Sequence, residues 1–188
     1  MSEVSCRVFV PLVEHLHARG QSPDLLVEGL PFSAEDLNRP SNRIPWEDFV
    51  VVLERATRLL GGVEQIEQLA YNSYPKVMGI IGVLASNFVS TRSIYHIGAK
   101  WHGPNLFSCT SATCEDLPDG RVREIIEILP PHRDSELFFR LLRGSLRSAP
   151  SVFGQPDAAV EMEIHPRRAI YTITLPPPLN LLQNLFLF

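Results

Sequence analysis

The residues best suited to ligand-binding chemistry are aromatic and imidazole side chains at helical spacing in the middle of the chain. They share one stripe of a helix, formed by Ile94, Tyr95, Gly98, Trp101 and His102. Such a stripe offers stacking surface, a phenol hydroxyl, and an imidazole that can donate a hydrogen bond or coordinate a metal when neutral. The ligand-binding residues predicted from this stripe and the element after it are Tyr95, Trp101, His102 and Phe107. The alternative is that this face belongs to the core, with His102 hydrogen-bonded inside it.

The other polar residues do not form a catalytic set. His96 falls on a separate polar stripe and is expected to be exposed. Arg140, Arg143 and Arg147 follow one side of a helix, where they would either bind an anion or form its solvated face. The sequence contains no G-x-S-x-G elbow, P-loop, H-E-x-x-H or C-x-x-C motif. We therefore predict a protein that is not an enzyme, with no catalytic residues, no metal ligands and no required cofactor.

Length and composition indicate an ordinary globular protein. A chain of 188 residues can bury a sizeable core without disulfides or metals. The net charge of -4 argues against a direct nucleic-acid surface, and no run of apolar residues is long enough to span a membrane. The three cysteines follow no metal-binding spacing, and their odd number argues against a closed disulfide framework. With no signal peptide at the N-terminus, these features predict a reduced, cytoplasmic setting.

The elements that must position the stripe fall into two halves. The first half is predicted to be helical, and its clearest helix starts after Pro45 and ends at Gly61. Further helices are predicted over 63–71 and 76–86, and Ser33 with Asp36 resembles a capping box.

The second half changes to the two-residue period of β-strands. Strands are predicted over 106–114, 121–129, 160–165 and 168–175, with a helix from a cap at Asp134 to Arg147 between the two hairpins. Four antiparallel strands with an intervening helix, packed against a helical N-terminal half, make the predicted fold class α+β. The glutamates at 161 and 163 are expected on the outer face of their strand.

The end of the chain is predicted to act separately from the sheet. We expect one sensor domain over residues 1–175, and a proline linker with the start of a terminal helix over 176–188. The last ten residues are mostly apolar, so they either dock on their own domain or contribute to a homodimer.

One family resemblance covers about residues 12–154. The segment 26–62 has a short helix, a loop and a proline-opened helix, and GIIGVLASNFVSTRSI with AKWH supplies a glycine-rich turn and a helix. This order resembles the N-terminal arabinose-binding domain of AraC-type transcription regulators. The resemblance implies a domain that binds a small molecule in an apolar pocket and takes part in signal transduction and transcription regulation. The family's helix-turn-helix half is absent, so a kinase or cyclase output remains equally open.

A second resemblance is to heme-based nitric oxide/oxygen sensor domains. It rests on the length, the helical first half and the sheet-plus-helix second half. Those domains hold the heme propionates with a Y-x-S-x-R signature, for which the nearest match here is Tyr71 and Ser73, with Pro75 in the place of the arginine. The resemblance implies heme as a possible cofactor, with His102, or else His96, as the iron ligand. A third alternative is a dimerisation or scaffold module without ligand.

Overall fold

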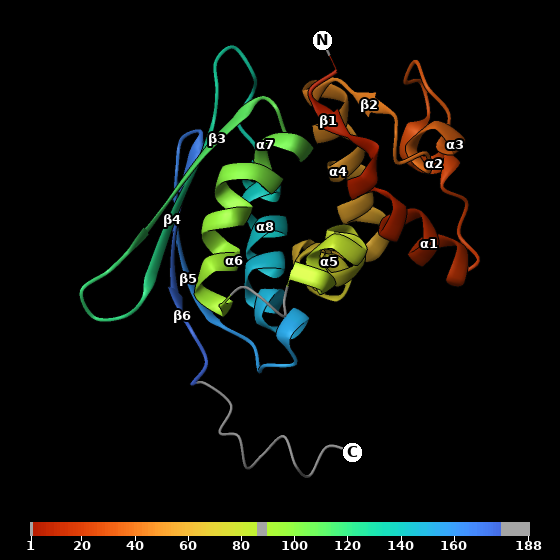
Figure 1. Ribbon diagram of the computed structural model, residues 1–188. Coiled ribbons are helices and arrows are strands. Elements are labelled where there is room, and N and C mark those ends of the chain that lie inside the picture. Colours follow the sequence, from red (N-terminus) through yellow and green to blue (C-terminus); the bar gives the residue numbers. More distant parts are fainter. Residues whose placement is uncertain (1, 86–89, 178–188) are drawn as a thin grey trace, which may run out of the picture.

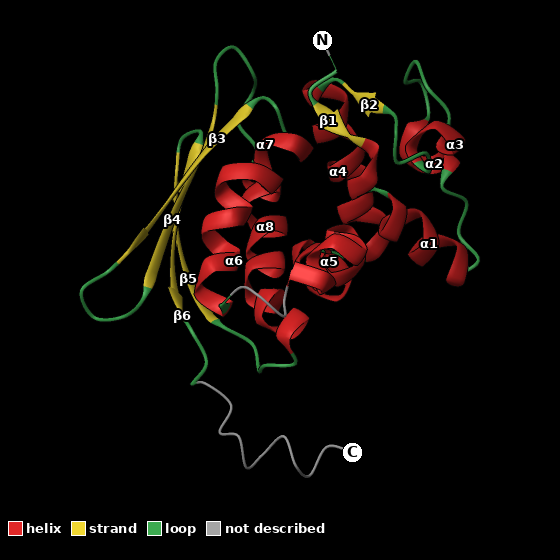
Figure 2. Ribbon diagram, viewed as in Figure 1, coloured by secondary structure: helices red, strands yellow, loops and turns green. Residues whose placement is uncertain are grey.

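A layer of helices packs against one face of a four-stranded sheet in the computed structural model (Figure 1). The structure describes the backbone of residues 2–85 and 90–177, and the side chains of these ranges except 75–85, 101 and 102. Figure 2 shows that the strands of this sheet lie together on one side, while the helices and a separate pair of short strands lie on the other. This arrangement confirms the predicted α+β fold class. The predicted division at residue 175 stays a prediction, and the terminal residues 178–188 lie outside the described part.

The N-terminal part is a group of short helices around one longer helix. Its helices are η1 (Cys6–Val8), α1 (Val10–Ala18), α2 (Asp24–Val27), α3 (Ala34–Leu37) and α4 (Trp46–Leu60). The two-residue strands β1 (Val4–Ser5) and β2 (Arg43–Ile44) pair antiparallel beside them. Pro45 precedes α4, and Gly61 ends it with φ 94°, a left-handed conformation that glycine adopts without strain. The predicted α4 and the capping box of α3, in which Ser33 and Asp36 bond to each other's backbone, are both confirmed.

Helix α5 (Val63–Ala85) is a single helix, so the prediction of two helices over 63–71 and 76–86 was wrong. Pro75 suggested a boundary because proline removes one helical hydrogen bond and disfavours helix before it. The helix nevertheless continues, and it packs more extensively against α8 (Glu136–Ser148) than any other two helices of the described chain pack together. This tertiary packing outweighs the local preference of the sequence.

The segment that carries the predicted binding stripe is a chain of three short helical pieces. These are α6 (Thr91–Ile97), the π-helical η2 (Gly98–His102) and α7 (Gly103–Leu106). The prediction that a strand begins at Leu106 was wrong, because the first strand of the sheet begins at Thr110. Gly103 does not stop the helix, since its backbone stays right-handed and continues directly into α7.

The sheet has the order β3-β4-β6-β5, with every neighbouring pair antiparallel. Its strands are β3 (Thr110–Asp116), β4 (Val122–Ile128), β5 (Ala159–His165) and β6 (Arg168–Thr174). The two predicted hairpins are therefore confirmed. Helix α8 and the 3-10 helix η3 (Ala149–Phe153) connect them, and α8 is capped by Ser135, not by Asp134 as predicted. The Ser135 hydroxyl accepts a hydrogen bond from the Phe138 N–H.

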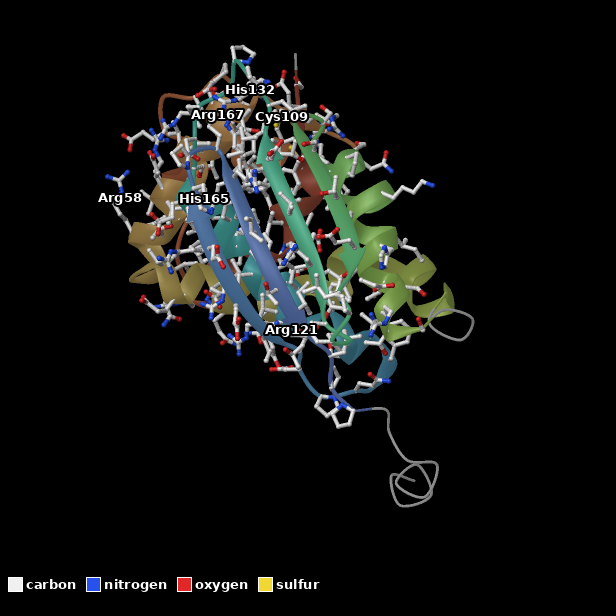
Figure 3. All side chains as sticks on the ribbon, turned by 90° about the vertical axis from the view of Figure 1, so that its left-hand side faces the viewer. Arg58, Cys109, Arg121, His132, His165 and Arg167 are labelled. Carbon is white, nitrogen blue, oxygen red and sulfur yellow. The ribbon has the colours of Figure 1, made fainter. Side chains whose placement is uncertain are left out.

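The two faces of the sheet differ sharply in polarity. The face toward the helices buries Val122, Ala169 and Ile173. The outer face, turned toward the viewer in Figure 3, carries charged side chains that pair across strands, such as Arg123 with Glu115 at 3.0 Å. The predicted outward position of the glutamates at 161 and 163 is confirmed. Within residues 2–85 and 90–177, no helix is long and apolar enough to cross a membrane.

Candidate functional site

A cavity of about 130 Å³ lies between the inner face of the sheet and helices α5, α6 and α8. Its walls are mostly aliphatic and aromatic, so nearly all of its surface is apolar. The residues that line it include Leu69, Ser73, Tyr74, Ile94, Tyr95, Gly98, Gly103, Phe107, Thr110, Ala112, Glu124, Leu142 and Ser145. An engineered cavity of about 150 Å³ in another protein binds benzene, so this space has the size of one small apolar molecule.

Two of the four predicted binding residues lie on the wall of this cavity. Tyr95 is buried in α6 and donates a hydrogen bond from its hydroxyl to the Leu146 carbonyl oxygen at 3.0 Å. Phe107 follows α7 and stacks edge-on against Phe138 of α8, with ring centroids 4.9 Å apart. The side chains of the other two, Trp101 and His102, lie outside the described residues. The structure thus places Tyr95 and Phe107 at one cavity, while their role in binding stays a prediction.

The most unusual residue of the site is Glu124 on β4, which the sequence-based prediction missed. Its side chain lines the cavity, and only 4% of the residue is exposed. Its Oε2 atom has no hydrogen-bond partner among the described residues. Burial raises the pKa of this carboxyl from 4.5 to about 8, because the interior disfavours the charged form. A signal was present in the sequence: Glu124 alternates with Val122 and Ile126, and both of these point inward.

The groups around Glu124 are acids that stay neutral near pH 7. In the sheet it lies directly between Cys114 of β3 and Tyr171 of β6. Burial, assisted by the nearby Glu124, raises the pKa of the Cys114 thiol to about 12 and that of the Tyr171 hydroxyl well above its usual value. Burial and the same carboxyl raise the pKa of the Tyr74 and Tyr95 hydroxyls. The described surroundings of Glu124 therefore hold no positive charge to offset its ionisation.

Three hydroxyl groups on the cavity wall have already used their hydrogens. Ser73 donates to the Leu69 carbonyl oxygen at 2.6 Å, and Thr110 donates to the Phe107 carbonyl oxygen at 2.9 Å. Tyr95 donates to a backbone carbonyl in the same way. These hydroxyls can offer a ligand only the lone pairs of their oxygens.

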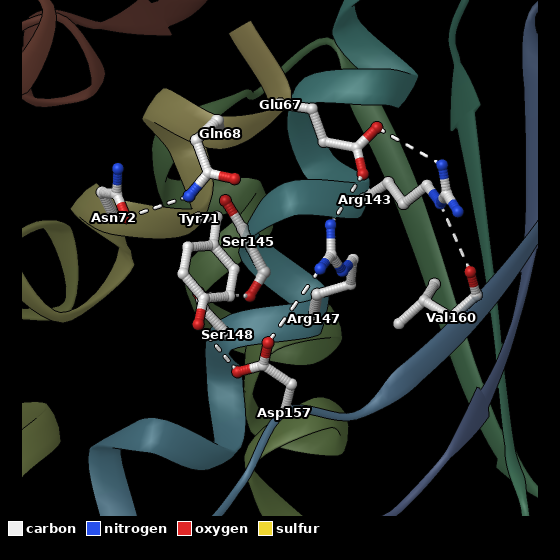
Figure 4. Close-up of polar contacts among 10 residues, drawn as sticks. All are labelled: Glu67, Gln68, Tyr71, Asn72, Arg143, Ser145, Arg147, Ser148, Asp157 and Val160. Atoms are coloured by element: carbon white, nitrogen blue, oxygen red, sulfur yellow. Dashed lines mark hydrogen bonds and ion pairs between the residues drawn. The ribbon is translucent and has the colours of Figure 1, made fainter. Parts of the chain in front are cut away.

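Two of the three arginines in the α8 stripe have a structural role that the sequence did not predict. Arg143 and Arg147 each place a guanidinium nitrogen 3.4 Å from the carboxylate of Glu67 on α5 (Figure 4). Arg147 also approaches Asp157, whose carboxylate accepts a hydrogen bond from the Tyr71 hydroxyl at 2.9 Å. Two arginines of the stripe are therefore paired across the α5–α8 junction, while Arg140 pairs with the exposed Glu136 of its own helix, as on a solvated face.

His96 lies away from the cavity, as the polar stripe predicted. Its side chain is 38% exposed, and its Nε2 atom lies 3.2 Å from the carboxylate of Asp116. Arg92, one helical turn earlier, pairs with the same carboxylate at 2.8 Å. Hydrogen bonds from these two side chains lower the pKa of Asp116. This cluster ties α6 to the exposed end of β3.

Comparisons with known proteins identify the fold but not a sequence family. No family model matches the chain, and no curated protein matches it in sequence. Solved structures of H-NOX proteins match over nearly the whole chain. The Fe(II) unliganded H-NOX protein from K. algicida has a TM-score of 0.70 at 7% identity, covering 94% of this chain and 99% of that one.

Two further structures agree with this match. A triple mutant of the H-NOX protein from S. oneidensis in the Fe(II) ligation state has a TM-score of 0.67 at 13% identity, covering 95% of this chain and 99% of that one. A single mutant of the T. Tengcongensis H-NOX has a TM-score of 0.63 at 6% identity, covering 91% and 96%. At such low identity the similarity shows that the fold is H-NOX-like. The comparisons give no support to the predicted AraC-type membership.

Proposed function

We propose that this chain is a ligand-sensing domain of the H-NOX-like fold, in which a small, largely apolar molecule occupies the cavity between helices and sheet. The observation that carries the proposal is the apolar cavity with the unpartnered Glu124 carboxyl on its wall. A buried carboxyl without a partner costs several kcal/mol of stability, which a purely structural core would avoid. In this proposal the domain binds its ligand without catalysing a reaction.

The proposal is tested by filling the cavity. Ala112 of β3 lines it, so Ala112→Phe places a ring in the space that a ligand would use. We expect saturating ethylbenzene to raise the melting temperature of the wild type by a few degrees and to leave that of Ala112→Phe unchanged. Thr113→Leu is the matched control, because Thr113 is the next residue of the strand and is exposed. Equal shifts in all three proteins, or none in the wild type, would contradict the proposal.

Heme-based gas sensing is the second candidate, and the structural neighbours favour it over other kinds of sensing. Two of these neighbours are Fe(II) H-NOX proteins, and a further structural neighbour concerns the modulation of heme redox potential through protein-induced porphyrin distortion. In this chain the backbone of His102 lies in η2, between the cavity-lining Gly98 and Gly103.

The described lining residues do not fit a heme. They include no histidine to ligate iron and no arginine or lysine to pair with propionates. A space of about 130 Å³ suits a single small ring far better than a porphyrin. The two residues that match the propionate signature also lie in different surroundings. The Tyr71 hydroxyl donates a hydrogen bond to Asp157, while Ser73 lines the cavity.

An absorption spectrum separates the two candidates. The wild type and His102→Ala are each incubated with hemin, passed through a desalting column and scanned from the ultraviolet to the visible. A sharp Soret band that His102→Ala loses would establish the heme candidate. A spectrum without a bound-heme Soret band, together with stabilisation by ethylbenzene, supports direct binding of an organic ligand.

A further inference from the structure

We propose that the ligand of this cavity is a small apolar amine, whose ammonium group pairs with the carboxylate of Glu124. This inference rests on the proposed function and adds the chemical class of the ligand. It follows from the hydrogen-bonding character of the wall, from its charge and from its size.

Three of the five hydroxyl-bearing residues on the described wall offer a ligand only acceptors. The hydroxyl hydrogens of Ser73, Tyr95 and Thr110 are directed to backbone carbonyl oxygens. The other polar groups of the described wall are the Tyr74 and Ser145 hydroxyls and the Glu124 carboxyl, whose Oε2 has no partner among the described residues. A ligand complements this carboxyl oxygen when it brings its own N–H or O–H donor.

The charge of the wall selects a cation among such donors. The described lining has no arginine, lysine or histidine, so the ionised Glu124 would be uncompensated there. An ammonium group supplies the missing charge and a charge-assisted hydrogen bond to Oε2, which is about twice as strong as a neutral one. An anionic ligand would be repelled by the Glu124 carboxylate and would find no cationic side chain on the described wall.

The size of the cavity limits the apolar part of the ligand. A volume of about 130 Å³ is close to that of an engineered cavity that holds benzene. The aliphatic side chains of Leu69, Ile94 and Leu142 on three helices suit one ring or a short branched chain. Benzylamine, which joins one ring to one ammonium group, represents this class.

Binding of such an amine changes the protonation of the site. Burial gives Glu124 a pKa of about 8, so at pH 7 most of the free protein carries a proton on this carboxyl. A primary alkylamine is already an ammonium ion at that pH. Forming the ion pair therefore releases one proton from Glu124 to solvent, and affinity rises by up to about tenfold per pH unit between pH 6 and 8.

The other titratable groups that face Glu124 do not contribute to this pH dependence. They are Tyr74 from α5, Tyr95 from α6, Cys114 from β3 and Tyr171 from β6. Each has a pKa raised further above its ordinary value, so each stays neutral throughout the range from pH 6 to 8. From α8, Arg143 acts on Tyr171 but is paired with Glu67.

The experiment is calorimetric titration of the full chain with benzylamine, benzyl alcohol, benzoate and ethylbenzene, which are similar in size. We expect benzylamine to bind the wild type ~10- to 100-fold more tightly than benzyl alcohol, with benzoate weakest. Glu124→Gln should lose this preference for the amine. Glu127→Gln, on the exposed face of the same strand, should keep it. Circular dichroism establishes that both variants are folded.

The outcomes separate this inference from the proposed function. If ethylbenzene or benzyl alcohol binds the wild type as tightly as benzylamine, the amine inference is wrong and the cavity remains a ligand site. The same holds if Glu124→Gln retains the preference for the amine. If none of the four compounds binds, both the inference and the proposed function are overturned.

Discussion

Two glutamates, Glu67 and Glu124, face inward on opposite sides of α8, and they differ in whether their carboxyl groups have partners. Glu67, whose side chain is 12% exposed, is held between two arginines of α8. Glu124 is more deeply buried, and its Oε2 has no partner in the described structure. A buried charge that is compensated within the fold fastens two elements together. A buried carboxyl that is left uncompensated beside a cavity is a candidate contact for the proposed ligand.

The largest effect that we predict from this comparison is the dependence of folding stability on pH that Glu124 causes. Its pKa is 4.5 when exposed and about 8 in the folded protein, so the folded state favours the protonated form. This contribution to stability is complete below about pH 4.5, declines as the pH rises and is lost above about pH 8. The full decline amounts to roughly 5 kcal/mol at 1.36 kcal/mol per pKa unit.

Replacing the carboxyl by an amide removes this titration. We therefore expect the free energy of unfolding of Glu124→Gln, measured with urea at several pH values, to fall much less between pH 5 and pH 9 than that of the wild type. A variant whose stability declines as steeply as the wild type would show that Glu124 is not buried as a neutral acid.

The second prediction concerns the close backbone contact between α5 and α8 beside Glu67. Gly144 lets α8 approach α5 so closely that an added Cβ would lie 2.1 Å from the Glu67 carbonyl oxygen. Gly144→Ala should therefore destabilise the protein by about 3 kcal/mol in urea unfolding. Gly98→Ala is the control, because its Cβ meets no described atom within 4 Å and its backbone is helical. If Gly144→Ala lowers the free energy of unfolding no more than Gly98→Ala does, helices α5 and α8 lie farther apart than in this structure.

The third prediction concerns the ion pairs of Glu67. Glu67→Ala leaves Arg143 and Arg147 without their shared carboxylate and should cost about 1–2 kcal/mol, since both guanidinium groups are partly solvated. Glu136→Ala, which removes an exposed i,i+4 pair with Arg140 on the same helix, should cost less than about 0.5 kcal/mol. Chemical denaturation of the two variants makes the comparison, and equal losses would contradict a structural role for Glu67.

The smallest effect is expected at the exposed Asp116 cluster. Hydrogen bonds from Arg92 and His96 lower the pKa of Asp116, so this carboxylate adds stability that is lost as the pH falls through its lowered pKa. The groups are exposed, so Asp116→Asn should change the melting temperature at pH 7 by only about a degree. A shift of several degrees would assign the cluster a larger role in holding α6 on the sheet.

Much of the fold was predictable because local signals agreed with the tertiary structure. Helix α4 has a proline before it and a glycine pair after it, and the second hairpin alternates between inward and outward residues. Helix α5 was divided wrongly because Pro75 is a local signal that packing against α8 overrides. The end of the α6–η2–α7 segment was misplaced because Gly103-Pro104 looks like a stop, although its backbone continues the helix.

The site was predictable only in part. The helical stripe correctly brought Tyr95 to the cavity, and Phe107 lies on its wall. Glu124 was missed because a charged residue in a half-exposed strand is usually solvated, although its alternation with Val122 and Ile126 indicated the inner face. The register of β4 against β6 adds that it lies opposite Tyr171. The pairing of Glu67 with α8 joins residues 76 and 80 positions apart, which no local pattern encodes.

The central claim, that the cavity holds a ligand beside Glu124, is tested most directly by intermolecular NOEs in methyl-labelled protein with ethylbenzene. Cross-peaks are predicted from the ligand to methyl groups of Leu69, Ile94 and Leu142, which line the cavity on three helices. Cross-peaks only to the exposed Leu25 or Leu129, or no cross-peaks at all, would contradict the account.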